Sequence, residues 1–368
     1  MSRTIKPSWL IGLLVMSALA ATACGGSTSG SSGRQVRLQL KWVPQAQFAG
    51  YYAAIEKGFY KKEGLDVQIL PGGPDVTPEA VVAGNKAEFG IDFLPSLLTS
   101  REQGMDLVNI AQALDRSGLL EVQWKDSGIK TVPDLRGKRV GVWCCGNQYE
   151  VFAALRKNQV NPAKDVTIVD QPFDMNQLLS RLVDSAAAMT YNELAQVLEQ
   201  QDPKTGKLYT TDQLNLISIE QAGTGMLEDG IFVQGKWLQD SKNQETAKKF
   251  LKASFLGWIY CRDHVDECVQ FVLKNGSTLG AGHQMWQMNE INALVWPSPK
   301  GIGIMDGEAY RRTAQIAQDY GVLKRAPDRD AFRTDLAESV LHSLRDAGYD
   351  VHGENYEKSS VQITPGGK

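Results

Sequence analysis

Strand-like and helix-like segments alternate along this chain in two successive series, and only helix-like segments follow. The first series predicts strands at 36–42, 66–70, 88–91 and 107–113 and helices at 49–62, 78–83 and 95–103. The second predicts strands at 139–143, 166–169, 186–189, 214–219 and 229–234 and helices at 148–157, 176–183 and 193–200. Such alternation favours mostly parallel sheets with helices on both faces. The fold class is therefore α/β.

The remaining helices, predicted at 244–260, 265–273, 283–294, 307–320 and 332–346, suggest that the chain returns to complete its first unit. We therefore expect two lobes and a helical C-terminal part. The expected divisions are 35–124 for the first part of lobe one, 125–221 for lobe two, 222–347 for the return with the C-terminal helices, and 348–368 for a polar, loose tail.

The N-terminus has the pattern of a secretory signal peptide over residues 1–23. Arg3 and Lys6 precede an apolar stretch at 9–20, and small residues lead directly to Cys24. A cysteine at this position resembles a bacterial lipobox, and the Gly/Ser-rich run after it predicts a flexible tether over 24–34. Ordinary cleavage near Ala23 is the alternative. Either way we expect an exported protein, anchored by lipid in the first case to the outer face of the cytoplasmic membrane, in a periplasm or at a cell surface.

Charge and motif patterns exclude several function classes. The formal net charge is −3, which suggests neither nucleic acid nor an anionic membrane as a partner. The histidines are scattered without metal-ligand spacing, and neither a nucleophile elbow nor a Rossmann glycine pattern is present. We therefore expect no catalytic residue, metal or cofactor. We also expect a monomer that binds a ligand and is not an enzyme.

Four cysteines follow Cys24, and pairing is the first expectation for an exported chain. On one unbroken helix Cys261 and Cys268 would be about 10 Å apart, too far for a disulfide. A turn at Asp263 would bring them together, and we favour this bridge. Cys144 and Cys145 form either a vicinal disulfide or two free thiols.

Several sequence motifs resemble those of one family of bacterial solute-binding proteins. They are KWVPQAQFAGYYAAIEKGFYKKEGLDV at 41–67, AEFGIDFLPSLL at 87–98, DLRGKRVGVW at 134–143 and MTYNE at 189–193. The chain resembles the SsuA/THI5-like, or NMT1, group from about Val36 to about Tyr320. The resemblance implies a two-lobed periplasmic-binding-protein fold that delivers its ligand to the membrane permease of an ABC importer. Members bind small solutes such as the thiamine pyrimidine precursor, riboflavin and alkanesulfonates.

Candidate ligand-binding residues follow the predicted strands, because ligands of open α/β sheets bind at the carboxyl ends of strands. Aromatic faces interspersed with amides suit a planar heteroaromatic ring. The first group consists of Trp42, Gln45, Gln47, Phe48 and Tyr51. Phe48 and Tyr51 could instead pack the helix on the sheet.

The other candidates lie at later crossings between strand and helix. They are Asp92 and Phe93; Trp143, Asn147 and Tyr149; Tyr191, Asn192 and Glu193; and Glu228 near an expected hinge. The structural alternatives are a helix cap for Asp92, a plain turn around Asn147, and a solvated carboxylate for Glu193.

Three other functions stay open. One branch of the family makes the thiamine pyrimidine from its own histidine, but Gln45-Ala46-Gln47-Phe48 lacks that histidine. The chain could also bind a sulfonate-like solute, or hand its ligand to a receptor as a sensor subunit.

The lipobox interpretation predicts a modified Cys24. Intact-mass analysis of the protein from a membrane fraction should show a diacylglycerol adduct at a chain that begins with Cys24. An unmodified N-terminus at or after Cys24 would overturn this prediction.

Overall fold

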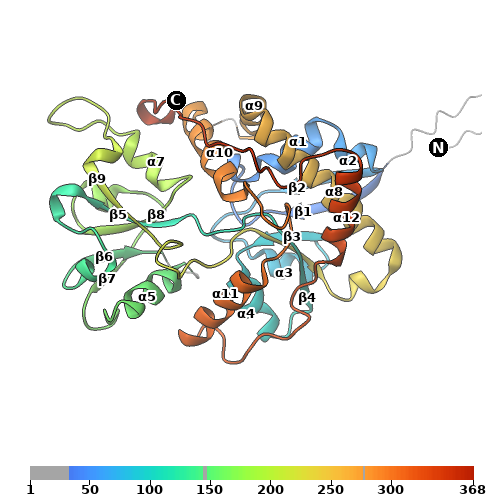
Figure 1. Cartoon of the computed structure of the whole chain (residues 1–368), viewed down its shortest axis with the longest axis horizontal. Coiled ribbons are helices and arrows are strands. Elements are labelled where there is room, and N and C mark those ends of the chain that lie inside the picture. Colours follow the sequence, from blue (N-terminus) through green and yellow to red (C-terminus); the bar gives the residue numbers. More distant parts are fainter. Residues whose placement is uncertain (1–32, 144–146, 277) are drawn as a thin grey trace, which may run out of the picture. The chain divides into compact units, whose positions relative to one another are not determined.

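The chain builds two separate β-sheets, described by a computed structural model over residues 33–143, 147–276 and 278–368 (Figure 1). The first sheet has the strand order β2-β1-β3-β10-β4. Its strands are β1 (Arg34–Gln39), β2 (Leu65–Leu70), β3 (Phe89–Asp92), β4 (Leu107–Gln112) and β10 (Gly230–Gln234). β1 pairs in parallel with β2 and β3, whereas β10 is antiparallel to both β3 and β4. The chain thus returns from the second sheet to complete the first.

The second sheet has the same plan, with the order β7-β6-β8-β5-β9. Its strands are β5 (Leu119–Trp124), β6 (Arg139–Val142), β7 (Thr167–Asp170), β8 (Ser185–Met189) and β9 (Leu214–Ser218). β6 pairs in parallel with β7 and β8, and β5 is antiparallel to β8 and β9. The expected α/β class is confirmed, with one antiparallel strand in each sheet. We call the first sheet with its helices lobe one and the second sheet with its helices lobe two.

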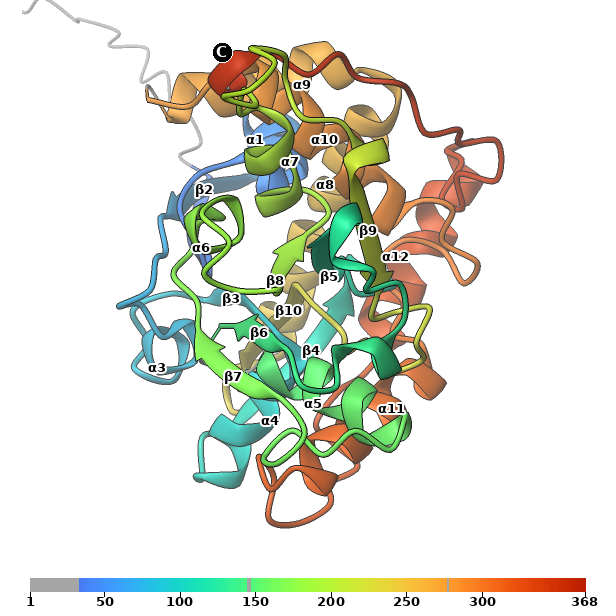
Figure 2. The same ribbon diagram turned by 90° about the vertical axis from the view of Figure 1, so that its left-hand side faces the viewer.

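Helices surround both sheets (Figures 1 and 2). Those between strands are α1 (Ala49–Glu56), α2 (Phe59–Lys62), α3 (Pro78–Ala83), α4 (Leu94–Glu102), α5 (Gln148–Lys157), α6 (Asn176–Leu179) and α7 (Glu193–Leu198). The C-terminal helices are α8 (Ser241–Asp263), α9 (Val265–Asn275), α10 (Ala281–Val295), α11 (Gly307–Asp319) and α12 (Asp335–Asp346). Among the described helices, none is long and apolar enough to cross a membrane.

Two glycines let helices α1 and α8 cross with their backbones almost in contact. A Cβ atom on Gly257 of α8 would strike the carbonyl oxygen of Gly50 in α1. A Cβ atom on Gly50 would in turn meet the buried indole of Trp258. This crossing anchors the long helix α8 on lobe one.

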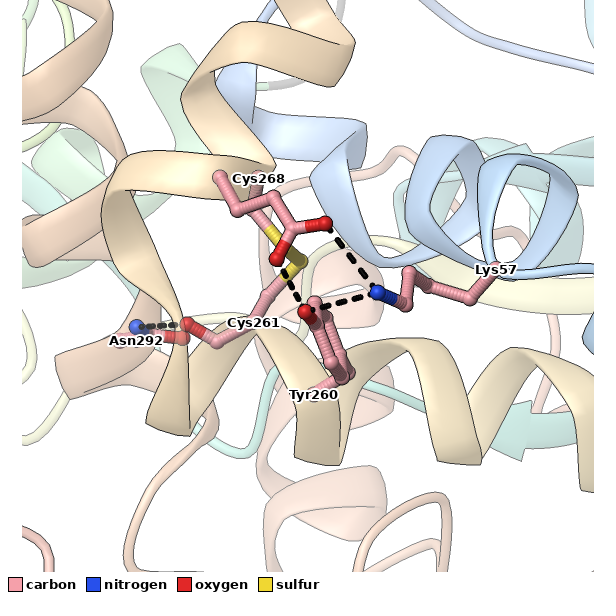
Figure 3. The surroundings of a disulfide bond; sticks show 6 residues. Lys57, Tyr260, Cys261, Cys268 and Asn292 are labelled. Carbon is pink, nitrogen blue, oxygen red and sulfur yellow. Dashed lines mark hydrogen bonds and ion pairs between the residues drawn. A yellow bond between two sulfur atoms is a disulfide. The ribbon is translucent and has the colours of Figure 1, made fainter.

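A disulfide joins Cys261 in α8 to Cys268 in α9, with the Cα atoms 5.5 Å apart (Figure 3). The two helices meet at His264, whose φ of −137° and ψ of 59° are not helical. The chain therefore turns at His264, one residue after Asp263, at which the sequence predicts the turn. The carbonyl of Cys261 accepts a hydrogen bond from the Asn292 side chain at 3.1 Å, which ties α10 to the same corner.

Three elements differ from the expectations. The helix expected at 49–62 is divided at Gly58, whose φ of 69° is left-handed. Strand β5 was not foreseen, and because it belongs to the second sheet, the crossing between lobes precedes Leu119 and does not follow Trp124. The segment 348–368 is not loose throughout, since Val351 and Gly367 are buried.

The expectations for the signal peptide at 1–23, the lipidated Cys24, most of the tether, and the Cys144–Cys145 pair lie outside the described residues. Gly33–Lys368 is one compact unit in itself.

The α1–α8 crossing predicts a steric penalty at Gly257. In a helix, Gly→Ala ordinarily stabilises by up to about 1 kcal/mol. Here overpacking against Gly50 should reverse the sign and lower the free energy of unfolding by about 1–3 kcal/mol, measured by urea denaturation. The control is Gly307→Ala at the start of α11, where the nearest atom to the new Cβ is an Arg311 side-chain nitrogen at 3.5 Å. Equal stability of the two variants would contradict this account of the crossing.

Candidate functional site

The functional candidates gather at the junction of the two lobes, around the ends of β1, β3, β6 and β8 and two connecting segments. These segments, 113–118 and 219–229, carry the chain from β4 to β5 and from β9 back to β10 (Figure 1). Side chains from both lobes meet there.

A buried ion pair lies at the lobe-one side of this junction. The Lys41 ammonium is 2.5 Å from a carboxylate oxygen of Asp229, and both side chains are less than a tenth exposed. The same ammonium lies 3.3 Å from the centre of the Phe93 ring. Gln47 donates to the other oxygen of Asp229 at 2.8 Å, and Gln45 donates to Gln47 at 2.6 Å. Removal of one partner would leave an uncompensated buried charge, so the pair fixes the geometry of this corner.

Carboxyl groups outnumber cations around this pair. Burial raises the pKa of Glu79 on α3 to about 9, with Asp92 nearby as a second cause. Burial also raises the pKa of Asp92 to about 6, although Lys41 opposes the shift. Asp92 accepts a hydrogen bond from the N–H of Phe93 at 2.7 Å, but Phe93 is the N-cap residue of α4 and no side chain caps this helix, so Asp92 is not its cap. The site therefore favours neutral, protonated carboxyls or a ligand that neutralises them.

Glu228 connects the lobes through its carboxylate. One oxygen accepts the backbone N–H of Gly118 at 2.8 Å, and the other accepts the hydroxyl of Tyr191 at 3.2 Å. Burial raises its pKa to about 7; the Lys41 cation opposes this shift and the Asp229 charge adds to it. Glu228 thus holds the returning segment against the first connecting segment and the loop after β8.

Glu150 on α5 makes a parallel connection. Its carboxylate accepts the Ser117 hydroxyl at 2.7 Å and the Met226 N–H at 3.0 Å. Burial, followed by repulsion from Glu228, raises its pKa well above the ordinary value. The buried carboxyl groups of Glu228 and Glu150 therefore hold both connecting segments by hydrogen bonds.

Three aromatic rings meet across the junction. Trp42 of lobe one contacts Phe173 of lobe two edge-on, with ring centres 4.8 Å apart. Phe173 stacks on Trp143 at 6.5 Å, and Trp143 donates its indole N–H to the Pro172 carbonyl at 3.2 Å. Phe173 is 45% exposed, whereas Trp143 is 4% exposed, so the open part of this aromatic surface is mainly the Phe173 ring. We refer to Trp42, Phe173 and Trp143 as the aromatic cluster.

Several predicted residues lie in the core instead. Phe48 and Tyr51 are fully buried, and Tyr51 packs edge-on against Trp258 of α8 at 5.7 Å. Phe48 and Tyr51 therefore match the alternative in which they pack the helix on the sheet. Tyr149 contacts Phe152 of its own helix α5 at 6.3 Å.

Other predicted residues bind within their own loops. The Glu193 carboxylate accepts the Met189 N–H at 3.0 Å and the Asn192 amide at 2.7 Å and is 4% exposed, so it is not solvated, and each oxygen already has a partner in its own loop. Burial raises its pKa to about 7. The Asn192 oxygen also faces His283 of α10 at 2.9 Å. Asn147 precedes α5 and makes no side-chain cap.

The sequence reasoning missed Lys41, Asp229, Glu150 and Phe173. Lys41 and Asp229 adjoin the predicted Trp42 and Glu228, but their pairing is long-range and leaves no local pattern. Phe173 could have been found by the carboxyl-end rule, since it follows β7.

Two α/β sheets joined by a pair of connecting segments, the first sheet completed by the returning strand β10, define the architecture of periplasmic binding proteins. The solved structure of the periplasmic aliphatic sulphonate binding protein SsuA from Escherichia coli matches with a TM-score of 0.63. The match has 14% identity and covers 81% of this chain and 91% of that chain, so it establishes the fold alone.

Over residues 45–268 the sequence matches the family model described as NMT1/THI5 like, and the chain belongs to this family. The riboflavin-binding protein RibY from Chloroflexus aurantiacus is 26% identical over 333 residues, covering 84% of this chain and 88% of that protein. The formylaminopyrimidine-binding protein from Halalkalibacterium halodurans is 22% identical and covers 72% and 77%. A 4-amino-5-hydroxymethyl-2-methylpyrimidine phosphate synthase of Saccharomyces cerevisiae, THI5, is 28% identical over only 29% of this chain.

The raised pKa of Glu228 predicts a pH-dependent stability. Between about pH 4.5 and 7 the folded protein retains this proton while the unfolded chain has lost it, so stability falls as pH rises through this window. Glu228→Gln should remove about 2–3 kcal/mol of that fall, measured by urea denaturation at pH 5 and pH 8.

The control is Glu267→Gln. The hydrogen bond from Tyr260 is the leading cause of a lowered pKa at Glu267, so the contribution of this carboxyl to stability changes only below about pH 4.5. Glu267→Gln should therefore leave the difference in stability between pH 5 and pH 8 unchanged. An unchanged slope in Glu228→Gln would show that this carboxyl is ionised in the folded protein at pH 5.

Proposed function

We propose that this chain is the solute-binding lipoprotein of an ABC importer and captures a small, uncharged or cationic heteroaromatic ligand between its lobes. The candidate ligands are a thiamine pyrimidine precursor and riboflavin. The protein is exported, anchored through Cys24, and acts as a monomer without catalysis. Closure of the lobes on the ligand creates the form that docks on the permease.

The aromatic cluster is the observation that carries the proposal. It joins lobe one to lobe two, and it exposes aromatic surface beside buried hydrogen-bonding groups. A planar ring that stacks here would contact both lobes at once, which couples binding to closure. The binding proteins for riboflavin and formylaminopyrimidine, matched over most of this chain, support the same ligand class.

The charges of the junction argue against an anionic solute. Lys41 is already paired with Asp229, and the nearby carboxyls of Glu79, Asp92 and Glu228 would repel a sulfonate whenever they ionise. A permanently charged sulfonate would also lose its hydration without gaining an unpaired cation. A ring with amino groups can instead donate to these carboxyl oxygens.

Synthesis of the thiamine pyrimidine is the less favoured alternative. The synthase of Saccharomyces cerevisiae shares only a short segment with this chain. The run Gln45-Ala46-Gln47-Phe48 lacks the histidine of that branch; Gln45 donates to Gln47, and Gln47 donates to Asp229. A sensor subunit would bind its ligand in the same way and differ only in its docking partner.

The ligand itself is the first test. Mass spectrometry of small molecules released from the purified full chain should find a heteroaromatic compound. A thermal-shift screen should show stabilisation by thiamine pyrimidines or riboflavin and none by alkanesulfonates. Stabilisation by an alkanesulfonate alone would overturn the proposed ligand class.

Affinity for the compound identified in this way should depend on the aromatic cluster. Trp42→Ala should weaken binding by about ten- to a hundredfold, and Phe173→Ala by about tenfold, because each removes a stacking face. Calorimetry measures both. Tyr349→Ala is a matched control, since Tyr349 is 43% exposed, close to the 45% of Phe173, but lies outside the junction. Unchanged affinity in both cluster variants would contradict this site.

A further inference from the structure

The C-terminal segment 356–368 runs along helix α10 and ends on lobe two (Figure 1). The hydroxyl of Tyr356 donates to the Asn289 carbonyl at 3.3 Å. The Asn289 side chain and the Ser359 backbone exchange two hydrogen bonds, of 2.8 and 3.1 Å. Lys358 forms an ion pair with Glu290. The first half of the segment is therefore fixed to α10.

The second half of the segment contacts lobe two. Ile363 packs against the hydrophobic core of that lobe. The N–H of Gly366 donates to the carbonyl of Glu199, directly after α7, at 2.9 Å. Gly367 is buried so tightly that a Cβ atom there would lie 2.8 Å from His283 and 2.9 Å from the Glu199 carboxylate. One continuous segment thus holds both lobes.

Helix α10 makes its own contacts with lobe two beneath this segment. The indole N–H of Trp286 donates to the Thr190 carbonyl at 2.8 Å. His283 lies between the Glu199 carboxylate, at 2.8 Å, and the Asn192 oxygen, at 2.9 Å. The segment therefore covers an interface between α10 and α7 that is already paired.

This interface must separate when the lobes move apart. Apart from this C-terminal segment, the described chain passes between the lobes in the connecting segments 113–118 and 219–229. A rotation about these segments carries α7 away from α10. The hydrogen bond from Gly366 and the packing of Ile363 and Gly367 would then break together.

We propose that residues 356–368 form a strap that links α10 to α7 and holds the two lobes in their closed arrangement. The strap sets how readily the junction opens before a ligand enters or leaves. This role does not depend on the identity of the ligand, and it concerns a segment that the proposed function leaves unused.

Adjacent glycines provide a matched test. Gly366 and Gly367 both have left-handed φ values, of 63° and 69°, so an alanine strains the backbone at either position. Only at Gly367 does the new Cβ meet His283 and Glu199; at Gly366 nothing lies within 4 Å. Gly367→Ala should therefore displace the strap, and Gly366→Ala should leave it in place.

Hydroxyl-radical footprinting of the full chain in detergent, without added ligand, reports the opening. Trp143 at the junction is 4% exposed and Trp258 in the α1–α8 core is 2% exposed. In Gly367→Ala the oxidation rate of Trp143 should rise at least threefold, with Trp258 unchanged. In Gly366→Ala both rates should match the wild type.

Two results would overturn the strap. One is a Trp143 rate that stays at the wild-type level in Gly367→Ala while His283 becomes more reactive, because the strap would then be displaced without opening the lobes. The other is an equal rise in Gly366→Ala and Gly367→Ala. Parallel rises at Trp143 and Trp258 would indicate general unfolding, and deletion of residues 361–368 would then repeat the test without a steric clash. An unchanged oxidation rate of Trp143 in the variant that lacks residues 361–368 also rejects the proposal.

Discussion

The buried Lys41–Asp229 ion pair is the constraint around which the junction is organised. It links the end of β1 to the residue that precedes β10, two points that the whole of lobe two separates in the sequence. A buried charge without its partner costs several kcal/mol, so these two backbone points are held together. Trp42 directly follows one partner and Glu228 directly precedes the other. The pair thereby holds the residue with an aromatic face and the residue with an interlobe carboxyl at the same corner.

Most elements of the fold could be predicted from hydrophobic patterning, because each lobe alternates strands and helices of ordinary length. Strand β5 was missed for a physical reason. Glu121 and Gln123 make it look half solvated, yet both are fully buried. Ser185 on the neighbouring strand β8 bonds to both side chains, and this partner is invisible in the local sequence. The polar pattern of β5 therefore reflects an internal hydrogen-bond network and not an exposed face.

The candidate site was predictable in position more than in detail. The carboxyl-end rule led to Trp42, Asp92, Trp143 and Tyr191, all of which lie near the junction. It could not separate ligand-facing residues from core residues, because that depends on distant packing. Tyr51 is buried by Trp258, which lies in a helix that the chain adds much later. Glu193 was assigned to the ligand, but its carboxylate satisfies the N–H groups of its own loop.

The position of β10 in the first sheet has a consequence for the order in which the protein can assemble. β10 lies between β3 and β4, and its residues begin at Gly230, after the whole of lobe two. In a chain that emerges from its N-terminus first, all strands of lobe two are therefore synthesised before β10 can pair with β3 and β4. Lobe one closes only when the returning strand enters the gap between them. The sheet that begins first in the sequence is thus the one whose last strand is synthesised after the whole of the other sheet.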